Sequence, residues 1–225
     1  MASVGHIVVG MAAARVQSGG TGGRRPALAA MLFWAALSFL PDADVIGFGL
    51  GIRYADPWGH RGATHSLAFA LALGAAIGLL APRFGRPALR TGVMAALVVA
   101  SHALLDTLTD GGLGCALFWP FDLTRYFAPW TPLPVSPLGL GYLSPYGLYV
   151  ATVEIVVFAP LLLYAVARNR TQRTARPRPV AVGLGVVAWL MSLWLLMGGG
   201  TLRLHLTRAW HPGRSIALFN DLLSL

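Results

Sequence analysis

Long apolar stretches separated by short polar segments make up most of this 225-residue chain. The apolar runs lie at residues 4–16, 27–40, 64–82, 88–109, 146–167 and 180–198. The last four approach the ~20 residues that an α-helix needs to cross a bilayer. The first two are shorter, so we expect them to tilt, to re-enter the membrane or to be shielded by the longer helices. The pattern predicts an all-α fold, a polytopic membrane bundle of about five to six helices.

The composition also indicates an integral membrane protein. Hydrophobic residues make up 56% of the chain and charged residues only 11%. We expect residues 1–200 to form a single membrane domain, followed by a C-terminal tail at 201–225 that lies at the interface as an amphipathic helix. The apolar N-terminal run has no basic segment before it, so we expect it to be retained and not cleaved as a signal peptide.

All 17 basic residues are arginines, and with 8 acidic residues they give a formal net charge of +9. Such a charge is compatible with nucleic-acid binding, but the arginines fall between the apolar runs, where topology explains them better, so we expect no nucleic-acid partner. The basic segments hold Arg15, Arg24 and Arg25, then Arg83, Arg86 and Arg90, then Arg168, Arg170, Arg173, Arg176 and Arg178. If every run crosses, these segments share one face, which the positive-inside rule makes cytoplasmic. Segments 41–63 and 110–145 then face the periplasm or exterior.

Histidines and aspartates collect at the ends of the apolar runs, on this outward side. They are His6, Asp42, Asp44, His60, His65, His102 and Asp106. Ionisable side chains at membrane depth are costly to hold, so they indicate a functional site by default. Imidazole and carboxylate groups are ligands of divalent metals. We therefore expect a metal site near the outward-facing helix ends, and its expected ligands are His6, Asp42, Asp44, His65, His102 and Asp106.

His102 and Asp106 are four residues apart and so share one face of a helix. The alternative is a structural hydrogen bond that ties helices together. His60 and His65 lie around a glycine-containing turn, where one imidazole would bind metal and the other would orient a ligand or act as general acid. The alternative is that both are solvated at the interface. Thr64 is expected to cap a helix that begins at His65.

Asp42 and Asp44 end the second run, and two carboxylates this close can bind one cation or bridge two. Alone they would suggest an exposed acidic turn, but their position beside the histidines favours the metal. His6 is the least specific ligand, because a single histidine near a terminus is more often solvated or hydrogen-bonded. Glu154, the only glutamate, lies inside the fifth run and is a candidate ligand, proton carrier or partner of an arginine.

Three arginines lie on the outward side, Arg53, Arg61 and Arg125. Guanidinium groups pair with phosphate in bidentate geometry, so we expect these residues to bind a phosphorylated substrate. The alternative is that they only neutralise the neighbouring aspartates. The aromatic, proline-rich segment 110–145 is expected to form a lid, a lipid-facing wall or an interfacial anchor.

Several enzyme classes are excluded. The chain has no lysine, which excludes the membrane acid phosphatases whose motif begins with lysine. It has no H-E-x-x-H motif and no G-x-S-x-G motif, and one glutamate cannot supply a paired-Glu protease site. The lone Cys115 excludes an intrachain disulfide.

The order of these motifs resembles a known family. The matching stretches are His6, Leu40-Pro41-Asp42-Ala43-Asp44, His60-Arg61-Gly62-Ala63-Thr64-His65-Ser66, His102-Ala103-Leu104-Leu105-Asp106 and Pro120-Phe121. They are similar to the predicted membrane-bound metal-dependent hydrolases, whose best-known bacterial branch is described as LexA-binding, inner-membrane-associated hydrolases. The resemblance spans about residues 1–165 and implies a multi-helix protein of the bacterial inner membrane, a divalent metal and hydrolysis. It implies no particular substrate, and no residue here can be matched to the LexA association.

The order Asp, His, then H-x-x-x-D is also similar to the zinc site of bacterial phospholipase C. That likeness implies one zinc ion with four ligands. They are His65, His102, Asp106 and either Asp42 or Asp44. His6 and His60 would then be available for a second metal or for outer contacts.

We therefore expect a metal-dependent hydrolase that cuts a phosphoester or related bond of a lipid or amphiphile at the outer membrane face. Zinc suits mixed His and Asp ligands best, as one or two ions, with manganese or iron as alternatives. Asp44 is expected to take a proton from water, His60 to act as general acid or orienter, and Arg61 to steady the anion. The alternative is a metal-ion or proton-coupled transporter that uses the same cluster as a binding station, with Glu154 carrying protons. Transporter sites tend to lie at the midplane between repeated halves, which this chain lacks.

Overall fold

Helices account for nearly all of the regular structure in the computed structural model, which describes residues 3–19, 26–137, 139–166 and 179–198. Six α-helices lie in these ranges, and the described residues contain two isolated β-bridges but no strand. The helices are α1 (Ser3–Gln17), α2 (Leu28–Phe39), α3 (Leu67–Leu80), α4 (Ala88–Thr107), α5 (Pro145–Val166) and α6 (Pro179–Gly198). The prediction of an all-α helix bundle is confirmed. The expected tail at 201–225 lies outside the described residues.

Four segments are long and apolar enough to cross a membrane. They are Leu28–Leu50, Leu67–Phe84, Ala88–Thr107 and Pro145–Val166. Many of their large apolar side chains are exposed, such as Leu71, Leu79, Leu97 and Leu163, as a lipid environment permits.

The second apolar run is longer than the sequence predicted. It was expected to end at residue 40, but a 3₁₀-helix, η2 (Leu40–Leu50), continues directly from α2. Pro41 lies in the first turn of η2, a position where proline is tolerated. Short 3₁₀-helices also precede α3 (η3, Ala63–His65), follow it (η4, Ala81–Phe84) and precede α5 (η5, Gly139–Leu143).

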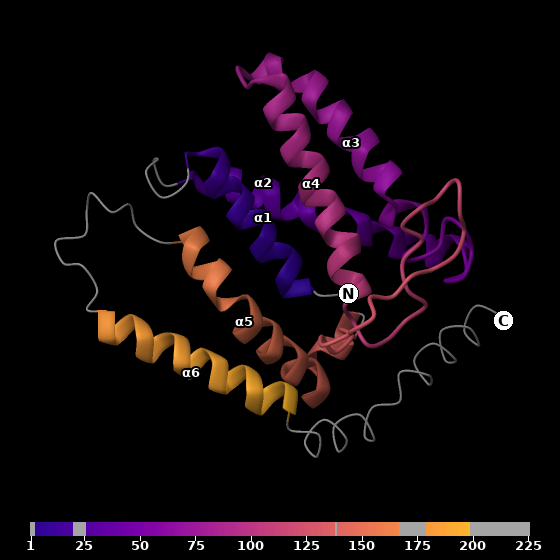
Figure 1. Cartoon of the computed structure of the whole chain (residues 1–225). Helices are drawn as coiled ribbons and strands as arrows, with labels where there is room; N and C mark the ends of the chain where they lie inside the picture. Colours follow the sequence, from indigo (N-terminus) through magenta and orange to yellow (C-terminus); the bar gives the residue numbers. More distant parts are fainter. Residues whose placement is uncertain (1–2, 20–25, 138, 167–178, 199–225) are drawn as a thin grey trace.

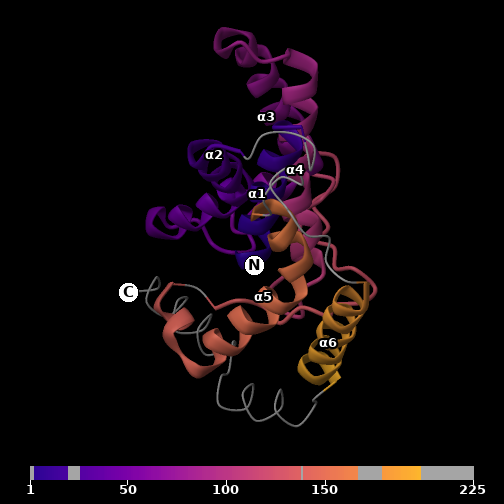
Figure 2. The same cartoon turned by 90° about the vertical axis from the view of Figure 1, so that its left-hand side faces the viewer.

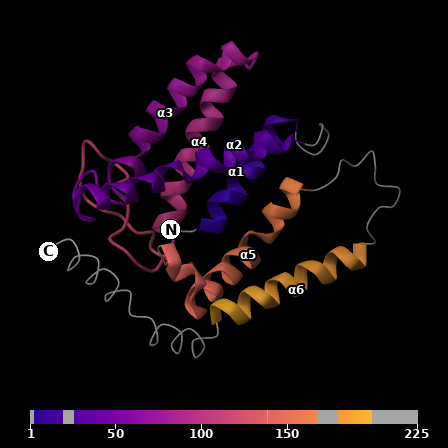
Figure 3. The ribbon, with the colours of Figure 1, turned by 180° about the vertical axis from the view of Figure 1, so that it is seen from behind.

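The short helix α1 is shielded by its neighbours. It packs against α2, α5 and α4, and Figures 1 and 3 show it between α2 and α5. Gly10 allows the close approach to α2, because a Cβ atom there would overlap the backbone of Trp34 and Ala35. Trp34 and Leu37 of α2 then meet Val99 of α4 in the apolar core.

Helices α3 and α4 form a tight antiparallel hairpin. A Cβ atom at Gly74 would lie 2.6 Å from the Cβ of Ala96, so small residues let the two backbones meet. Figure 2 shows this hairpin on one side of the bundle and α6 on the other. Helix α6 lies along α5, where Trp189 Nε1 donates a hydrogen bond to the Val156 carbonyl at 2.6 Å.

Candidate metal centre

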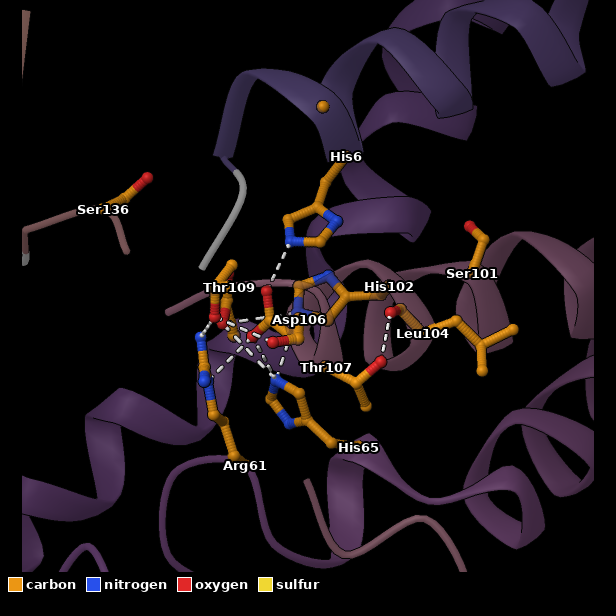
Figure 4. A network of polar contacts seen from close by, with 12 residues as sticks. His6, Arg61, His65, Ser101, His102, Leu104, Asp106, Thr107, Thr109 and Ser136 are labelled. Carbon is orange, nitrogen blue, oxygen red and sulfur yellow. Dashed lines mark hydrogen bonds and ion pairs between the residues drawn. The ribbon is translucent and has the colours of Figure 1, made fainter. Parts of the chain in front are cut away.

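The start of α1, η2, η3 and the end of α4 meet at one end of the bundle and bring the sequence-predicted polar residues together. His6 lies on α1, Asp42 and Asp44 on η2, His65 at the end of η3, and His102 and Asp106 on α4. All four histidines of the described residues fall in this cluster and are at most 2% exposed. Figure 4 shows His6, Arg61, His65 and His102 grouped around Asp106.

The central pair of the cluster is His65 and His102, whose Nε2 atoms lie 3.1 Å apart. His102 Nδ1 lies 2.8 Å from the Ser38 carbonyl oxygen, which can only accept, so this nitrogen carries the proton. His65 Nδ1 lies 3.2 Å from Asp44 Oδ2 and donates to that carboxylate. Both Nε2 atoms would then point lone pairs at each other, so a cation, either a proton or a metal ion, is needed between them.

In the protein without metal, that cation is a proton on His65. Burial lowers the pKa of His65, but its close contacts with the carboxylates of Asp42 and Asp44 outweigh this effect and raise the pKa to about 9. A metal ion bound by the Nε2 atom has to displace this proton, so metal binding is coupled to proton release.

The carboxylates of Asp42 and Asp106 lie beside these two imidazoles and form a four-residue group with them. Asp42 Oδ1 lies 3.4 Å from His102 Nε2 and 3.6 Å from His65 Nε2, and Asp106 Oδ2 lies 3.7 Å from His65 Nε2. With metal–ligand distances of about 2.0–2.1 Å, tetrahedral geometry separates two donor atoms by about 3.3–3.4 Å. The observed spacings of 3.1–3.7 Å are close to that value. The donor set Asp42, His65, His102 and Asp106 could therefore hold a divalent ion.

Asp42 is the clearest candidate ligand in this group. It is 2% exposed, and among the described residues neither of its carboxylate oxygens accepts a hydrogen bond. A buried carboxylate without hydrogen bonds is costly unless a cation compensates it. Its placement against two imidazole nitrogens is what a metal site requires.

Asp44 is differently placed, because its oxygens already accept several hydrogen bonds. It receives them from His60 Nδ1 at 2.7 Å, Thr64 Oγ1 at 2.7 Å and the Arg61 backbone N–H at 3.2 Å, in addition to His65 Nδ1. Asp44, His60 and His65 also form a second group close enough to hold an ion. The hydrogen bonds make Asp44 an orienting carboxylate for both imidazoles, an arrangement common around metal-bound histidine.

His60 remains neutral near pH 7 in this environment. Burial lowers the pKa of His60, and the hydrogen bond to Asp44 opposes that shift only in part. A neutral imidazole held by a carboxylate through Nδ1 keeps a lone pair on Nε2 and can accept a proton there.

Asp106 is clamped from both sides. His6 Nε2 lies 3.2 Å from Asp106 Oδ1, and the His6 ring stacks on the His102 ring with centroids 3.7 Å apart. Arg61 Nε lies 3.0 Å from Asp106 Oδ2. His6 is therefore positioned to hold Asp106 and His102, in contact with the four-residue group but not part of it.

The three outward arginines have different surroundings. Arg61 is 1% exposed and donates to the Gly111 carbonyl at 2.8 Å and to Thr109 Oγ1 at 2.9 Å, so it ties Asp106 to the segment after α4. Arg125 donates to backbone carbonyl oxygens of the turn that contains His60. The side chain of Arg53 is 81% exposed and pairs with Asp56 at 3.0 Å.

Glu154 has a partner that the sequence did not suggest. Its carboxylate accepts hydrogen bonds from the backbone N–H groups of Val4 at 2.6 Å and Gly5 at 3.1 Å, and from Ser136 Oγ at 2.7 Å. It thus caps the first turn of α1, where backbone N–H groups lack partners within the helix and a negative charge is favourable. Because His6 is next in that turn, Glu154 helps to set its position.

The cap of α3 differs from the prediction. The cap is Ser66, whose Oγ accepts a hydrogen bond from the Phe69 N–H at 3.0 Å, and α3 begins at Leu67. Thr64 instead lies in η3 and donates to Asp44. The expectation that Thr64 caps a helix beginning at His65 is wrong, because the 3₁₀ turn delays the start of the α-helix.

These observations define an integral membrane helix bundle with a buried His/Asp group that could hold a metal ion. Residues 1–175 match the family described as YdjM inner membrane protein, and the chain belongs to this family. It is 40% identical over 134 residues to inner membrane protein YbcI of Escherichia coli (strain K12), which covers 56% of this chain and 75% of that protein. No solved structure matches the chain. The family resemblance expected from the motifs is confirmed, and the family and the apolar helices indicate a bacterial inner membrane protein.

Proposed function

We propose that this protein binds a divalent metal ion through Asp42, His65, His102 and Asp106 and hydrolyses a phosphoester or related bond of a lipid or amphiphile. The observation that carries the proposal is the convergence of two imidazole Nε2 atoms and an Asp42 carboxylate without hydrogen bonds at near-tetrahedral spacing. Zinc fits these ligands best, with manganese or iron as alternatives. A divalent ion in such a site supplies a nucleophile by lowering the pKa of bound water to ~7 and polarises a phosphoryl or acyl oxygen.

The residues around the ligands have the roles that hydrolysis requires. Asp44 holds His65 so that its Nε2 faces the ligand group, and it holds His60 in a tautomer that can take up a proton. In this proposal His60 is the general base, oriented by Asp44, and later returns the proton to the leaving group. Arg61 fixes Asp106 and neutralises part of its charge, which leaves the ligand group less anionic. The active site is proposed to face the periplasm or exterior, because the arginine-rich segments lie at the opposite helix ends.

Metal content is the first test. Purified wild-type protein and the variants His102→Ala and Asp106→Ala would be analysed for zinc, manganese and iron. Asp122→Asn is the matched control, since it removes a partly exposed carboxylate of segment 110–145 that lies outside the four-residue group. The proposal expects about one ion per chain in the wild type and the control, and loss of that ion in both site variants. Stoichiometric metal that persists in both variants would contradict it.

A second function is favoured by one observation. The four candidate ligands are at most 2% exposed, as expected for an occluded cation site in a transporter. A hydrolase releases product from a phospholipid mixture in detergent, without a gradient, whereas a transporter moves the metal only across sealed vesicles. Product release that a chelator abolishes and added zinc restores supports hydrolysis. Metal uptake into vesicles without any product supports transport.

A further inference from the structure

An apolar groove of about 750 Å³ lies at the opposite end of the bundle from the metal centre, between the α1–α2 hairpin and the α3–α4 hairpin. Its lining includes Gln17 at the end of α1, eleven residues after His6. At ~1.5 Å per helical residue this is about 16 Å from the metal-centre end of α1. In Figures 1 and 3 the tip of the α3–α4 hairpin extends beyond this end of α1. The groove is therefore separate from the His/Asp cluster.

The walls of the groove are apolar and open to the surroundings of the bundle. Phe33 is 51% exposed, Leu80 49% and Phe84 78%, and Ile77 and Trp34 line the groove with them. All five lie on segments long and apolar enough to span a membrane. An acyl chain is the occupant that such walls fit, because it removes apolar surface without leaving polar groups unsatisfied.

One end of the groove is polar and positively charged. Arg86 lines it and is exposed, and no ion pair among the described residues joins Arg86 to a carboxylate. Gln17, which also lines this end, donates through Nε2 to Thr91 Oγ1 at 3.2 Å. The groove thus offers a guanidinium donor next to an apolar slot.

We propose that this groove binds one anionic glycerophospholipid, such as phosphatidylglycerol. The phosphate accepts hydrogen bonds from Arg86, and an acyl chain lies along Ile77 and Leu80. Basic pockets between membrane helices on the cytoplasmic side are suited to anionic headgroups, and the exposed Arg83 and Arg90 add to the positive charge there. A phosphatidylcholine headgroup carries its own positive charge, which the Arg86 guanidinium repels.

The test measures lipid retained by detergent-purified protein, using native mass spectrometry with phosphatidylglycerol or phosphatidylcholine of identical acyl chains. Wild type should retain one phosphatidylglycerol in preference to phosphatidylcholine. Arg86→Gln should weaken phosphatidylglycerol retention about tenfold, as expected for loss of a charge-assisted hydrogen bond. Arg83→Gln is the matched control, because it removes the same charge from the same α3–α4 connection at a position outside the groove lining. It should change retention less than about twofold.

A third variant tests the groove itself. Ala29→Trp places a large side chain in the groove lining at an exposed position and should reduce retention of both lipids. Equal retention of the two lipids by wild type, or equal loss in Arg83→Gln and Arg86→Gln, would overturn the proposal by showing diffuse charge attraction only. Unchanged retention in Ala29→Trp would place the lipid outside the groove and overturn it as well.

Discussion

The Nε2 atoms of His65 and His102 lie 3.1 Å apart, although the residues are 37 positions apart in the chain. A hydrogen bond at Nδ1 orients each ring. The partner is the Asp44 carboxylate for His65 and the Ser38 carbonyl for His102. The pair therefore requires a cation between its two nitrogens, a proton without metal and the metal ion with it. Metal binding and protonation compete for one position.

Asp42→Asn is expected to abolish tight metal binding. The substitution keeps the size of the side chain but removes the negative charge beside the two imidazoles. The affinity for the metal ion should therefore fall by more than ~10- to 100-fold, the loss typical when a hydrogen-bond partner of a ligand is removed. Competition with a chromophoric chelator measures the change, with Asp122→Asn as control. Wild-type affinity in Asp42→Asn would exclude Asp42 as a ligand.

Asp44→Asn is expected to behave differently. The variant keeps the four candidate ligands but weakens the hold on His65 and His60, so about one ion should still bind, with ~10- to 100-fold lower affinity. The same chelator titration reports both stoichiometry and affinity. Complete loss of metal, equal to that of Asp42→Asn, would show that Asp44 is itself a ligand.

Glu154→Ala is expected to destabilise the protein. Two backbone N–H groups of α1 and the Ser136 hydroxyl lose their acceptor, at a cost of about 1–3 kcal/mol. Thermal unfolding in detergent should show a lower Tm, and Glu154→Gln, which keeps one acceptor oxygen, should fall in between. Thr152→Ala on the same helix is the control, because Thr152 is exposed and bonds only to the Leu148 carbonyl of its own helix. A Glu154→Ala variant as stable as Thr152→Ala would refute the capping role.

Cys115 is expected to resist alkylation in the folded protein. Burial raises the pKa of its thiol to about 12, so at pH 8 the reactive thiolate is almost absent, and the side chain is 0% exposed. Because the pKa is raised, reactivity should increase only as the pH approaches that value or as the chain unfolds. Intact mass after iodoacetamide treatment, with and without denaturant, measures this. Rapid alkylation of native protein at pH 8 would be inconsistent with the packing around segment 110–145.

The sequence was most informative where chemistry and spacing are local. His102 and Asp106 share a helix face because of their four-residue spacing, and the structure places them on α4 with both side chains buried. The apolar runs predicted the helices because a membrane accepts only segments that satisfy their own backbone hydrogen bonds. The end of the second run was missed because proline is tolerated in the first turn of a helix and so does not always mark an end.

The partners of Glu154 and Arg61 could not be predicted from sequence. Glu154 bonds to residues about 150 positions away and Arg61 to residues about 50 away, and no local pattern encodes such pairs. The hydrogen bond between His102 and the Ser38 carbonyl could not be predicted either, because every residue has a backbone carbonyl. Only the packing of α2 against α4 selects this one.

The amino-acid sequence by itself determined a membrane helix bundle, its family and a set of histidines and aspartates at the helix ends, because apolar length and residue type are properties of the chain alone. Only the tertiary structure decided which members of that set face one another. Among the described residues neither oxygen of Asp42 accepts a hydrogen bond, and Asp42 lies against two imidazoles, whereas Asp44, two residues away, is held by hydrogen bonds. That difference depends on how η2 is rotated against η3 and α4, and rotation is set by packing across the whole bundle.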